Sequence, residues 1–461
     1  MTHDVLILGA GPAGSVTARR LAGAGARVLL VGGATRPGVE GLSARSRALL
    51  DEETLPPRGP DGAAVLHGPV HRGGEWAGRA VAGTEWLAER GRLAAALRAA
   101  AREAGAECRD GVVLHAARDQ ALWRVQWRGG GRAAAPILVD ARGRRGAERR
   151  GPLLLAYGQG FRVPRPGTQA PASAAAGWRP GEGALERAGA GGPGGGSQIH
   201  ALDEGWCWLA AQGTSLWVQV VSQPRRRQPA AWIAAAVAQV PALARALEGA
   251  VPEGAAVARP AHARRGLGCT DPAAWRVGDA ALALDPLSGQ GVYEALRGAR
   301  LVATAVQSVL NGGDSRLAQR FVAERQEEAW LRGVRAAAGF YRENAQRSAF
   351  WREAAAGYEA LLPAPRGANC IERRPVLEDG CIVERDVIVT AAHPRGVWHV
   401  SGVPLVALKG YLESADCVTV AGAAAALERP AASVAAAILW LQQTGIVARQ
   451  LHPGLVGRLN S

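Results

Sequence analysis

Three glycines near the start of the chain have the spacing of a phosphate-binding turn. Gly9, Gly11 and Gly14 follow the apolar run from Val5 to Leu8 in a G-x-G-x-x-G pattern. Gly9 allows a tight turn, Gly11 lets the backbone approach a pyrophosphate, and Gly14 lets the following helix pack against the strand. The helix begins with free N–H groups, which bind anions well. This stretch therefore predicts a dinucleotide site.

Two later stretches carry polar groups of the kind that hold such a cofactor. A strand over Ile137 to Val139 leads into Asp140, and another short strand leads into Asp279. An aspartate at the carboxyl end of a parallel strand can bind cofactor hydroxyl groups. A helix that opens at Gly289 and Gly291 directs its positive dipole end at a carbonyl or an anion. We expect these positions to meet the first turn at one cofactor.

The elements that position these residues follow from the spacing of apolar side chains. A second buried strand is expected over Val28 to Val31. The acid that usually binds the ribose is missing after it, and Glu40 is the nearest carboxylate. Helical spacing predicts one helix from Glu85 to Ala104 and a second over Trp232 to Leu247.

Changes in composition divide the chain into parts and predict an α/β fold. The expected parts are a discontinuous Rossmann-like cofactor-binding domain over residues 1–150 and 262–330, with 58–84 near the substrate side, an inserted antiparallel-sheet substrate domain over 151–261, a helical connector over 331–365, and a small C-terminal α+β module over 366–461. A mobile loop is expected at Gly189 to Ser197. A short strand at Ile446 to Ala448 after helices makes the last module winged-helix-like.

Composition also limits the possible partners. The net charge of +14 fits an acidic protein or peptide better than nucleic acid, because no zinc-finger spacing or aromatic and basic ladder accompanies it. The six cysteines are widely spaced and contain no C-x-x-C pair, so neither a disulfide framework nor a metal site is expected. The first strand begins almost at once, and no apolar run reaches the roughly 20 residues of a membrane span. A cytoplasmic protein is predicted.

Together, these motifs resemble the FAD-dependent monooxygenase superfamily, which includes tryptophan halogenases, geranylgeranyl-reductase-like enzymes and aromatic hydroxylases. The resemblance covers roughly residues 1–330. It implies that FAD is bound by the motif positions Gly9, Gly11, Ala13, Gly14, Glu40, Arg90, Asp140, Gly278, Asp279, Pro286, Gly289, Gln290 and Gly291.

The resemblance also implies an activity. FAD, reduced by NAD(P)H or by a separate reductase, would react with O2 and oxygenate an electron-rich ring through a C4a-hydroperoxide. The basic surface, the glycine-rich loop and the appended module are similar to flavoproteins that hydroxylate a tryptophan within a protein during tryptophylquinone cofactor biogenesis. A protein or peptide substrate is therefore expected. No catalytic residue is assigned, although Glu40 and His71 are candidates for a base. Candidates to line the substrate site are Glu75, Trp206, Trp208 and Trp217.

Two alternatives remain. The first is a monooxygenase, a reductase or a halogenase-like enzyme that acts on a small metabolite. Residues 205–208, Gly-Trp-Cys-Trp, resemble a halogenase signature, but the halogenases use a lysine between the early loop and the Arg90 helix, and the only lysine here is Lys409. The second alternative, of another class, is a flavin-binding protein whose last module binds a partner or nucleic acid without turnover.

Overall fold

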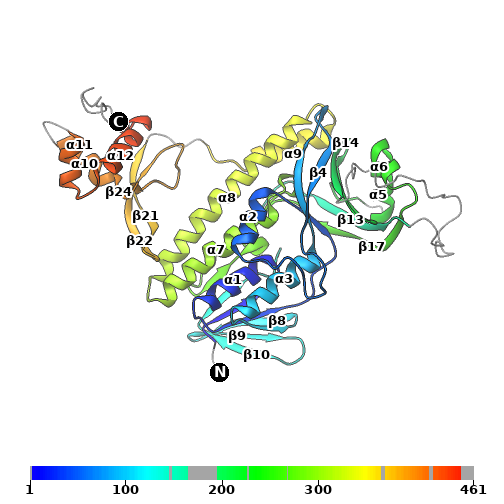
Figure 1. Cartoon of the computed structure of the whole chain (residues 1–461), viewed down its shortest axis with the longest axis horizontal. Helices are drawn as coiled ribbons and strands as arrows, with labels where there is room; N and C mark the ends of the chain where they lie inside the picture. The colour runs from blue at the N-terminus through cyan, green and yellow to red at the C-terminus, as the bar shows by residue number, and fades with distance from the viewer. Residues whose placement is uncertain are drawn as a thin grey trace. The chain divides into compact units, whose positions relative to one another are not determined.

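The computed structural model describes residues 3–144, 148–164, 195–225, 228–266, 268–364, 369–414 and 419–447. The chain divides into two compact units. The first consists of Met1–Gln307 and Gln326–Leu362, and the second consists of Ser308–Arg325 and Pro363–Ser461. Figure 1 labels the helices and strands used below.

A parallel sheet forms the expected Rossmann-like part of the first unit. Among the described residues it has five strands in the order β19 (Ala274–Arg276), β11 (Ile137–Asp140), β1 (Val5–Leu8), β2 (Val28–Gly32) and β7 (Glu107–Asp110). Helices α1 (Pro12–Gly23) and α3 (Arg90–Glu103) pack against each other beside it. The antiparallel strands β8 (Val113–Asp119), β9 (Leu122–Trp127) and β10 (Arg132–Ala135) share an apolar core with it. The α/β fold is confirmed.

A second, larger sheet extends beyond the predicted substrate domain. In the described part of the chain its nine strands are β17 (Val251–Pro260), β13 (Leu155–Arg162), β16 (Ser215–Ser222), β15 (Gly205–Gln212), β14 (Gly196–Leu202), β4 (His67–Trp76), β6 (Gly83–Glu89) and β3 (Val39–Leu42) in that order, with β5 (Arg79–Ala80) beside β4. The strands within residues 151–261 are antiparallel, as expected, but β14 also pairs in parallel with β4, so the sheet extends beyond that range. Gly74 permits this pairing, since a Cβ there would lie 2.1 Å from the carbonyl oxygen of Ile199.

Two predicted helices differ from those found. Residues 85–89 belong to β6, because this segment pairs with both β4 and β3, and α3 begins only at Arg90. The single helix expected over 232–247 is two, α5 (Pro229–Ala238) and α6 (Pro241–Ala246), because Pro241 cannot continue the ladder of hydrogen bonds. The expected glycine-rich loop lies outside the described residues up to Gly194, and β14 begins at Gly196.

The remaining elements surround the loop before α7. They are α2 (Ala44–Glu52), a small sheet of β12 (Glu148–Arg150), β18 (Arg264–Gly266) and β20 (Leu282–Ala283), the 3-10 turns η1 (Gly278–Ala280) and η2 (Pro286–Ser288), and the helices α7 (Gly291–Leu310), α8 (Ser315–Glu343) and α9 (Ala349–Glu359). Trp330 and Tyr341 of α8 and Trp351 and Tyr358 of α9 are fully buried in one core cluster. This cluster includes side chains from one face of the large sheet.

The second unit contains an α+β module, as expected, but its hairpin precedes its helices. The hairpin is β21 (Cys370–Glu378) and β22 (Cys381–Val389), and after it come β23 (His399–Val400), β24 (Val403–Pro404), α10 (Leu405–Ser414), α11 (Val420–Ala426) and α12 (Ala431–Gln443). Of the strand expected at 446–448, Ile446 and Val447 form no strand and Ala448 lies outside the described residues. Among those residues no single helix is long and apolar enough to cross a membrane, although α11 and α12, bent by 109°, pass that test when joined.

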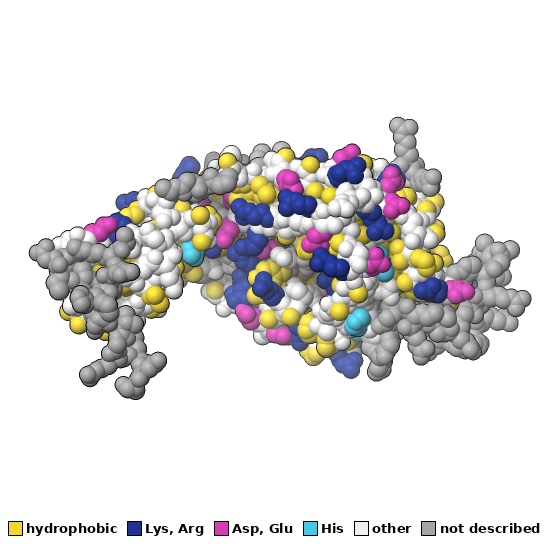
Figure 2. Space-filling model, turned by 90° about the horizontal axis from the view of Figure 1, so that it is seen from above, with side chains coloured by type: hydrophobic (Ala, Val, Ile, Leu, Met, Phe, Trp, Pro, Cys, Tyr) yellow, Lys and Arg dark blue, Asp and Glu magenta, His cyan; other side chains and the backbone are white. Residues whose placement is uncertain are grey.

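Charge is mixed on the visible surface. On the face that Figure 2 shows, blue arginine side chains lie among magenta acidic and yellow apolar ones. Many arginines pair with carboxylates, for example Arg342 with Glu359 and Arg374 with Glu324. On this face the arginine side chains are therefore interspersed with acidic and apolar ones.

Candidate functional site

The first glycine turn has the shape that a pyrophosphate needs. Gly9 has a φ of +110°, and a Cβ on Gly14 would lie 1.9 Å from the carbonyl oxygen of Gly9. Beside Gly11, by contrast, no atom of the described chain lies within 4 Å of a Cβ position. No side chain caps α1, and its first turn contains no acidic residue. The turn is thus closed on the side of the helix and open on the side where a phosphate would bind, so the residues fit the cofactor.

The other two motifs converge on this turn. Gly278 lies so close to the first motif that its Cβ would be 2.7 Å from Cβ of Ala13. The backbone N–H of Val277 donates to the carbonyl oxygen of Asp140, at 3.0 Å, and that of Ala141 donates to Leu8, at 2.7 Å. Segments that are far apart in the sequence therefore meet at the edge of the parallel sheet formed by the carboxyl ends of its strands.

The two aspartates at this edge are both paired with arginines. The Asp140 carboxylate accepts hydrogen bonds from Nε and Nη2 of Arg142, at 2.9 and 2.8 Å. Asp279 accepts one from Nε of Arg144, at 3.1 Å. Burial opposes ionisation of Asp140, but its hydrogen bonds and charge interactions with Arg142 outweigh this and hold its pKa below the usual value.

This lowered pKa makes the stability of the protein depend on pH. Because the folded pKa lies below the unfolded one, Asp140 stabilises the fold above about pH 4, and this contribution is lost as the pH falls through the folded pKa. We expect Asp140→Asn to cost about 2 kcal/mol at neutral pH and less in acid. Denaturant unfolding of the apoprotein at several pH values measures this. Asp119→Asn, at an exposed pair with Arg124, is the control; an equal, pH-independent loss in both variants would contradict the prediction.

Glu40 and Arg90 form an ion pair with each other. Glu40 lies on β3 and Arg90 opens α3, and both side chains are under one-third exposed. Their contacts with a ribose or a flavin remain predictions.

A buried carboxylate ties three helices of the site together. Glu53, at the end of α2, is fully buried and accepts from Arg19 and Arg20 of α1, at 3.0 and 2.6 Å. Arg300 of α7 lies 3.8 Å away. Glu53 therefore fixes α2 relative to the phosphate-binding helix and to the helix that follows the second motif.

The loop that leads into α7 is held by a second buried acid. Asp285 is buried, and its carboxylate accepts hydrogen bonds from the hydroxyls of Tyr358, at 2.6 Å, and Tyr341, at 3.1 Å, and from the backbone N–H of Leu287, at 2.9 Å. Burial raises the pKa of Asp285 above its usual value. The shape of the loop from Pro286 to Gly291 thus depends on side chains of α8 and α9.

Removing one of these hydroxyls should loosen the loop. We expect Tyr358→Phe to cost about 1–3 kcal/mol of stability, because a buried carboxylate loses its shorter hydrogen bond. Tyr341→Phe, at the longer contact, should cost less. Thermal unfolding of the two apoprotein variants gives the comparison, and the reverse order would show that the shorter bond is not the more important one.

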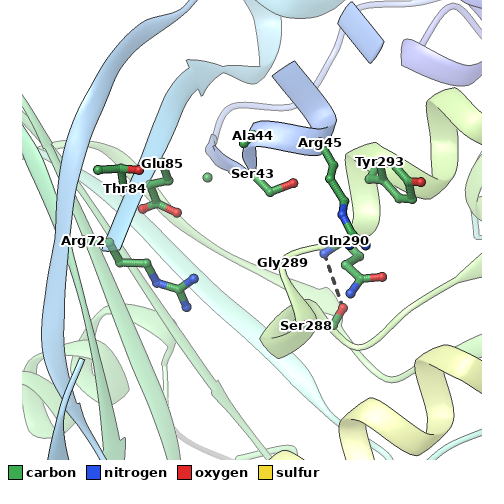
Figure 3. A pocket seen from close by; sticks show the side chains of 11 residues that line it. Ser43, Ala44, Arg45, Arg72, Thr84, Glu85, Ser288, Gly289, Gln290 and Tyr293 are labelled. Atoms are coloured by element: carbon green, nitrogen blue, oxygen red, sulfur yellow. Dashed lines mark hydrogen bonds between the residues drawn. The ribbon is translucent and has the colours of Figure 1, made fainter. Parts of the chain in front are cut away.

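A pocket of about 210 Å³ lies between this loop, α2 and the large sheet. Figure 3 shows Arg72 and Glu85 reaching from the strands toward Ser288, Gly289 and Gln290 on the opposite side. The full lining is Gly41, Ser43, Ala44, Arg45, Arg72, Thr84, Glu85, Ser288, Gly289, Gln290 and Tyr293. Two predicted FAD-binding residues, Gly289 and Gln290, thus lie in a pocket that the sheet closes from the other side.

The predicted substrate-lining residues divide between the two faces of the large sheet. Trp206, Trp208 and Trp217 lie on the face that includes Arg72 and Glu85, as the strand registers show. Trp206 and Trp208 are 2% and 8% exposed and belong to the core.

Two other candidates lie away from the pocket. His71 and Glu75 alternate with Arg72 along β4, so they occupy the opposite face of the sheet. Both side chains are exposed, and neither lines the pocket.

Sequence reasoning missed Arg72, Glu85 and Arg45 as pocket residues. Glu85 was placed in a helix, and its face became clear only once β6 was paired with β4. The sequence does contain a signal for the position of Arg45. Ser43 is a typical N-cap residue, which accepts a hydrogen bond from the N–H of Ser46, and it marks the start of α2, in whose first turn Arg45 lies.

Comparisons with known proteins rest on structure. No protein-family model matches the sequence, and no curated protein matches it. The peptidyl tryptophan dihydroxylase QhpG, described as essential for tryptophylquinone cofactor biogenesis, is 29% identical, with 97% of this chain and 100% of that chain covered and a TM-score of 0.77. The flavin-dependent halogenase CmlS is 16% identical, with 99% and 100% covered and a TM-score of 0.66. The flavin-dependent brominase Bmp2, as a triple mutant, is 19% identical, with 77% and 91% covered and a TM-score of 0.60. The expected resemblance is confirmed.

Proposed function

We propose that this chain, an FAD-dependent oxidoreductase with the fold of the flavin monooxygenases and halogenases, hydroxylates a tryptophan side chain within a protein during tryptophylquinone cofactor biogenesis. The observation that carries the proposal is the likeness to QhpG, which extends over 97% of this chain and all of that one. The likeness thus covers the second unit as well as the cofactor-binding part.

FAD would be held by the three converging motifs. The open turn at Gly11 and the free start of α1 would bind its pyrophosphate, and Gly289 and Gln290 would lie beside its ring system. Bound FAD supplies the activation of O2, with electrons from NAD(P)H or a separate reductase. Overall, one oxygen atom enters a ring C–H bond as hydroxyl, and the other leaves as water with two electrons and two protons from the donor.

The pocket provides what the protein must add to this chemistry. It would hold an aromatic ring between the loop at Ser288 and the strands that carry Arg72 and Glu85. A halogenase reaction is not favoured, because the only lysine, Lys409, lies on α10 of the second unit, where it pairs with Glu413 at 2.6 Å.

The test is oxygen transfer to a protein. The FAD-loaded enzyme is incubated with reductant, isotopically labelled O2 and a co-expressed partner protein that contains the candidate tryptophan. Mass spectrometry should find labelled oxygen on that tryptophan, and none when the residue is replaced with phenylalanine. An unmodified partner, together with oxygenation or halogenation of an added small arene, would support the small-metabolite alternative instead. A chain that binds no FAD would exclude both enzymatic functions.

A further inference from the structure

Glu85 is a buried acid in the pocket without a charged partner. Its side chain is 7% exposed, and its Oε1 accepts a hydrogen bond from the hydroxyl of Ser197 on β14. No basic side chain of the described residues forms a salt bridge with it, and within that part of the chain Oε2 has no hydrogen-bond partner. Oε2 is not among the fully buried atoms that lack a partner, so it is open to a ligand that enters the pocket.

The surroundings of Oε2 show where a ligand would lie. A Cβ on Gly41 would come within 2.6 Å of Oε2 and within 3.2 Å of the Trp208 ring. Acid and indole ring thus lie side by side against Gly41, where any larger residue would displace them. Arg72 is a second unsatisfied group on this wall, because its Nε is buried and has no partner among the described residues.

The opposite wall limits what the ligand can be. It is the loop of Ser288, Gly289 and Gln290, where the flavin ring is proposed to lie, so a group between the walls is held close to the place of oxygen transfer. Under the proposed function this group has an aromatic body, and the free oxygen of Glu85 requires one hydrogen-bond donor on it. The indole of tryptophan has this combination, because its ring nitrogen is a donor only.

We propose that Glu85, held by Ser197, accepts a hydrogen bond from the indole N–H of the target tryptophan and thereby orients the ring for oxygenation. This deepens the proposed function and rests on it. No bond to Glu85 forms or breaks. As an electrophilic oxygen adds to the ring, positive charge develops toward the indole nitrogen, and a nearby acid oxygen stabilises it. Glu85 therefore contributes to the rate as well as to binding.

The first test measures recognition without turnover. Indole and benzothiophene, which replaces the N–H with sulfur, are titrated into the oxidised, FAD-loaded enzyme, and the flavin absorbance is followed. The native enzyme should bind indole about 10- to 100-fold more tightly than benzothiophene. Glu85→Gln and Ser197→Ala should lose most of this preference. Glu253→Gln is the matched control, because Glu253 is an exposed acid of the same sheet and pairs only with Arg162 in the described part.

The second test measures coupling. With the partner protein as substrate, Glu85→Gln should still consume reductant but should release more hydrogen peroxide and less hydroxylated partner. Equal preference for indole in the native enzyme and in Glu85→Gln, with normal FAD affinity, would overturn the inference even if the native enzyme hydroxylates its partner. A Glu85-dependent preference for indole with no protein product would support the site and count against the protein substrate instead. Ser197→Ala, a small change, keeps the test valid if Glu85→Gln does not fold.

Discussion

Replacing Gly11 with valine is expected to lower FAD affinity by about 100-fold or more and to leave the fold of the apoprotein intact. The described chain offers free space beside Gly11, and its φ of −76° suits any residue. A side chain there can therefore collide only with what binds in that space. A 100-fold loss corresponds to about 2.8 kcal/mol.

Two other glycines of α1 provide the comparison. Gly23 also has free space but lies at the far end of the helix, so Gly23→Val should bind FAD normally. Gly14→Val should fail to fold, because even its Cβ would meet the Gly9 carbonyl at 1.9 Å. Flavin fluorescence titration gives the affinity, and circular dichroism gives the state of the apoprotein. Native FAD affinity in Gly11→Val would show that the pyrophosphate binds elsewhere.

A large loss of stability is also expected from Glu53→Ala. Its fully buried carboxylate pairs with Arg19 and Arg20, and breaking such a pair costs about 3 kcal/mol or more. Glu52→Ala, one residue earlier, removes an exposed acid that pairs with Arg300 and should cost less than about 1 kcal/mol. Because Glu53 joins α1, α2 and α7, its loss should also weaken FAD binding.

Thermal unfolding with and without FAD measures both effects. The apoprotein of Glu53→Ala should unfold at a clearly lower temperature than that of Glu52→Ala, and it should gain less from added FAD. If the two variants behave alike, the buried cluster has no special role in positioning the helices.

What the sequence could predict was local. The turn from Gly9 to Gly14 and the loop from Pro286 to Gly291 are short patterns in which each residue type has its own reason, and both were found in the correct elements. The strand predicted over Val28 to Val31 is observed as Val28–Gly32, because it depends on a continuous apolar run.

What could not be predicted depends on pairing between distant strands. Leu93, Leu97 and Ala101 have helical spacing, yet Leu87, in the same predicted helix, lies in a strand because β6 pairs with β3 and β4. This pairing turns Glu85 toward the pocket beside Ser197, which is more than a hundred residues away in the sequence. No local pattern contains that information, and so the pocket acid was missed while the cofactor turn was found.

The parallel sheet can fold completely only after its last strand has been synthesised. One of the two edge strands of the described sheet, β19, is made only after residue 273, yet it must dock against β11, which leaves the ribosome long before. Until then the nascent chain carries an open strand edge to which other chains can attach. Gly278 also packs against Ala13 of the first glycine motif, so the proposed cofactor site is complete only late in translation. A low flavin supply should therefore reduce the yield of FAD-loaded enzyme.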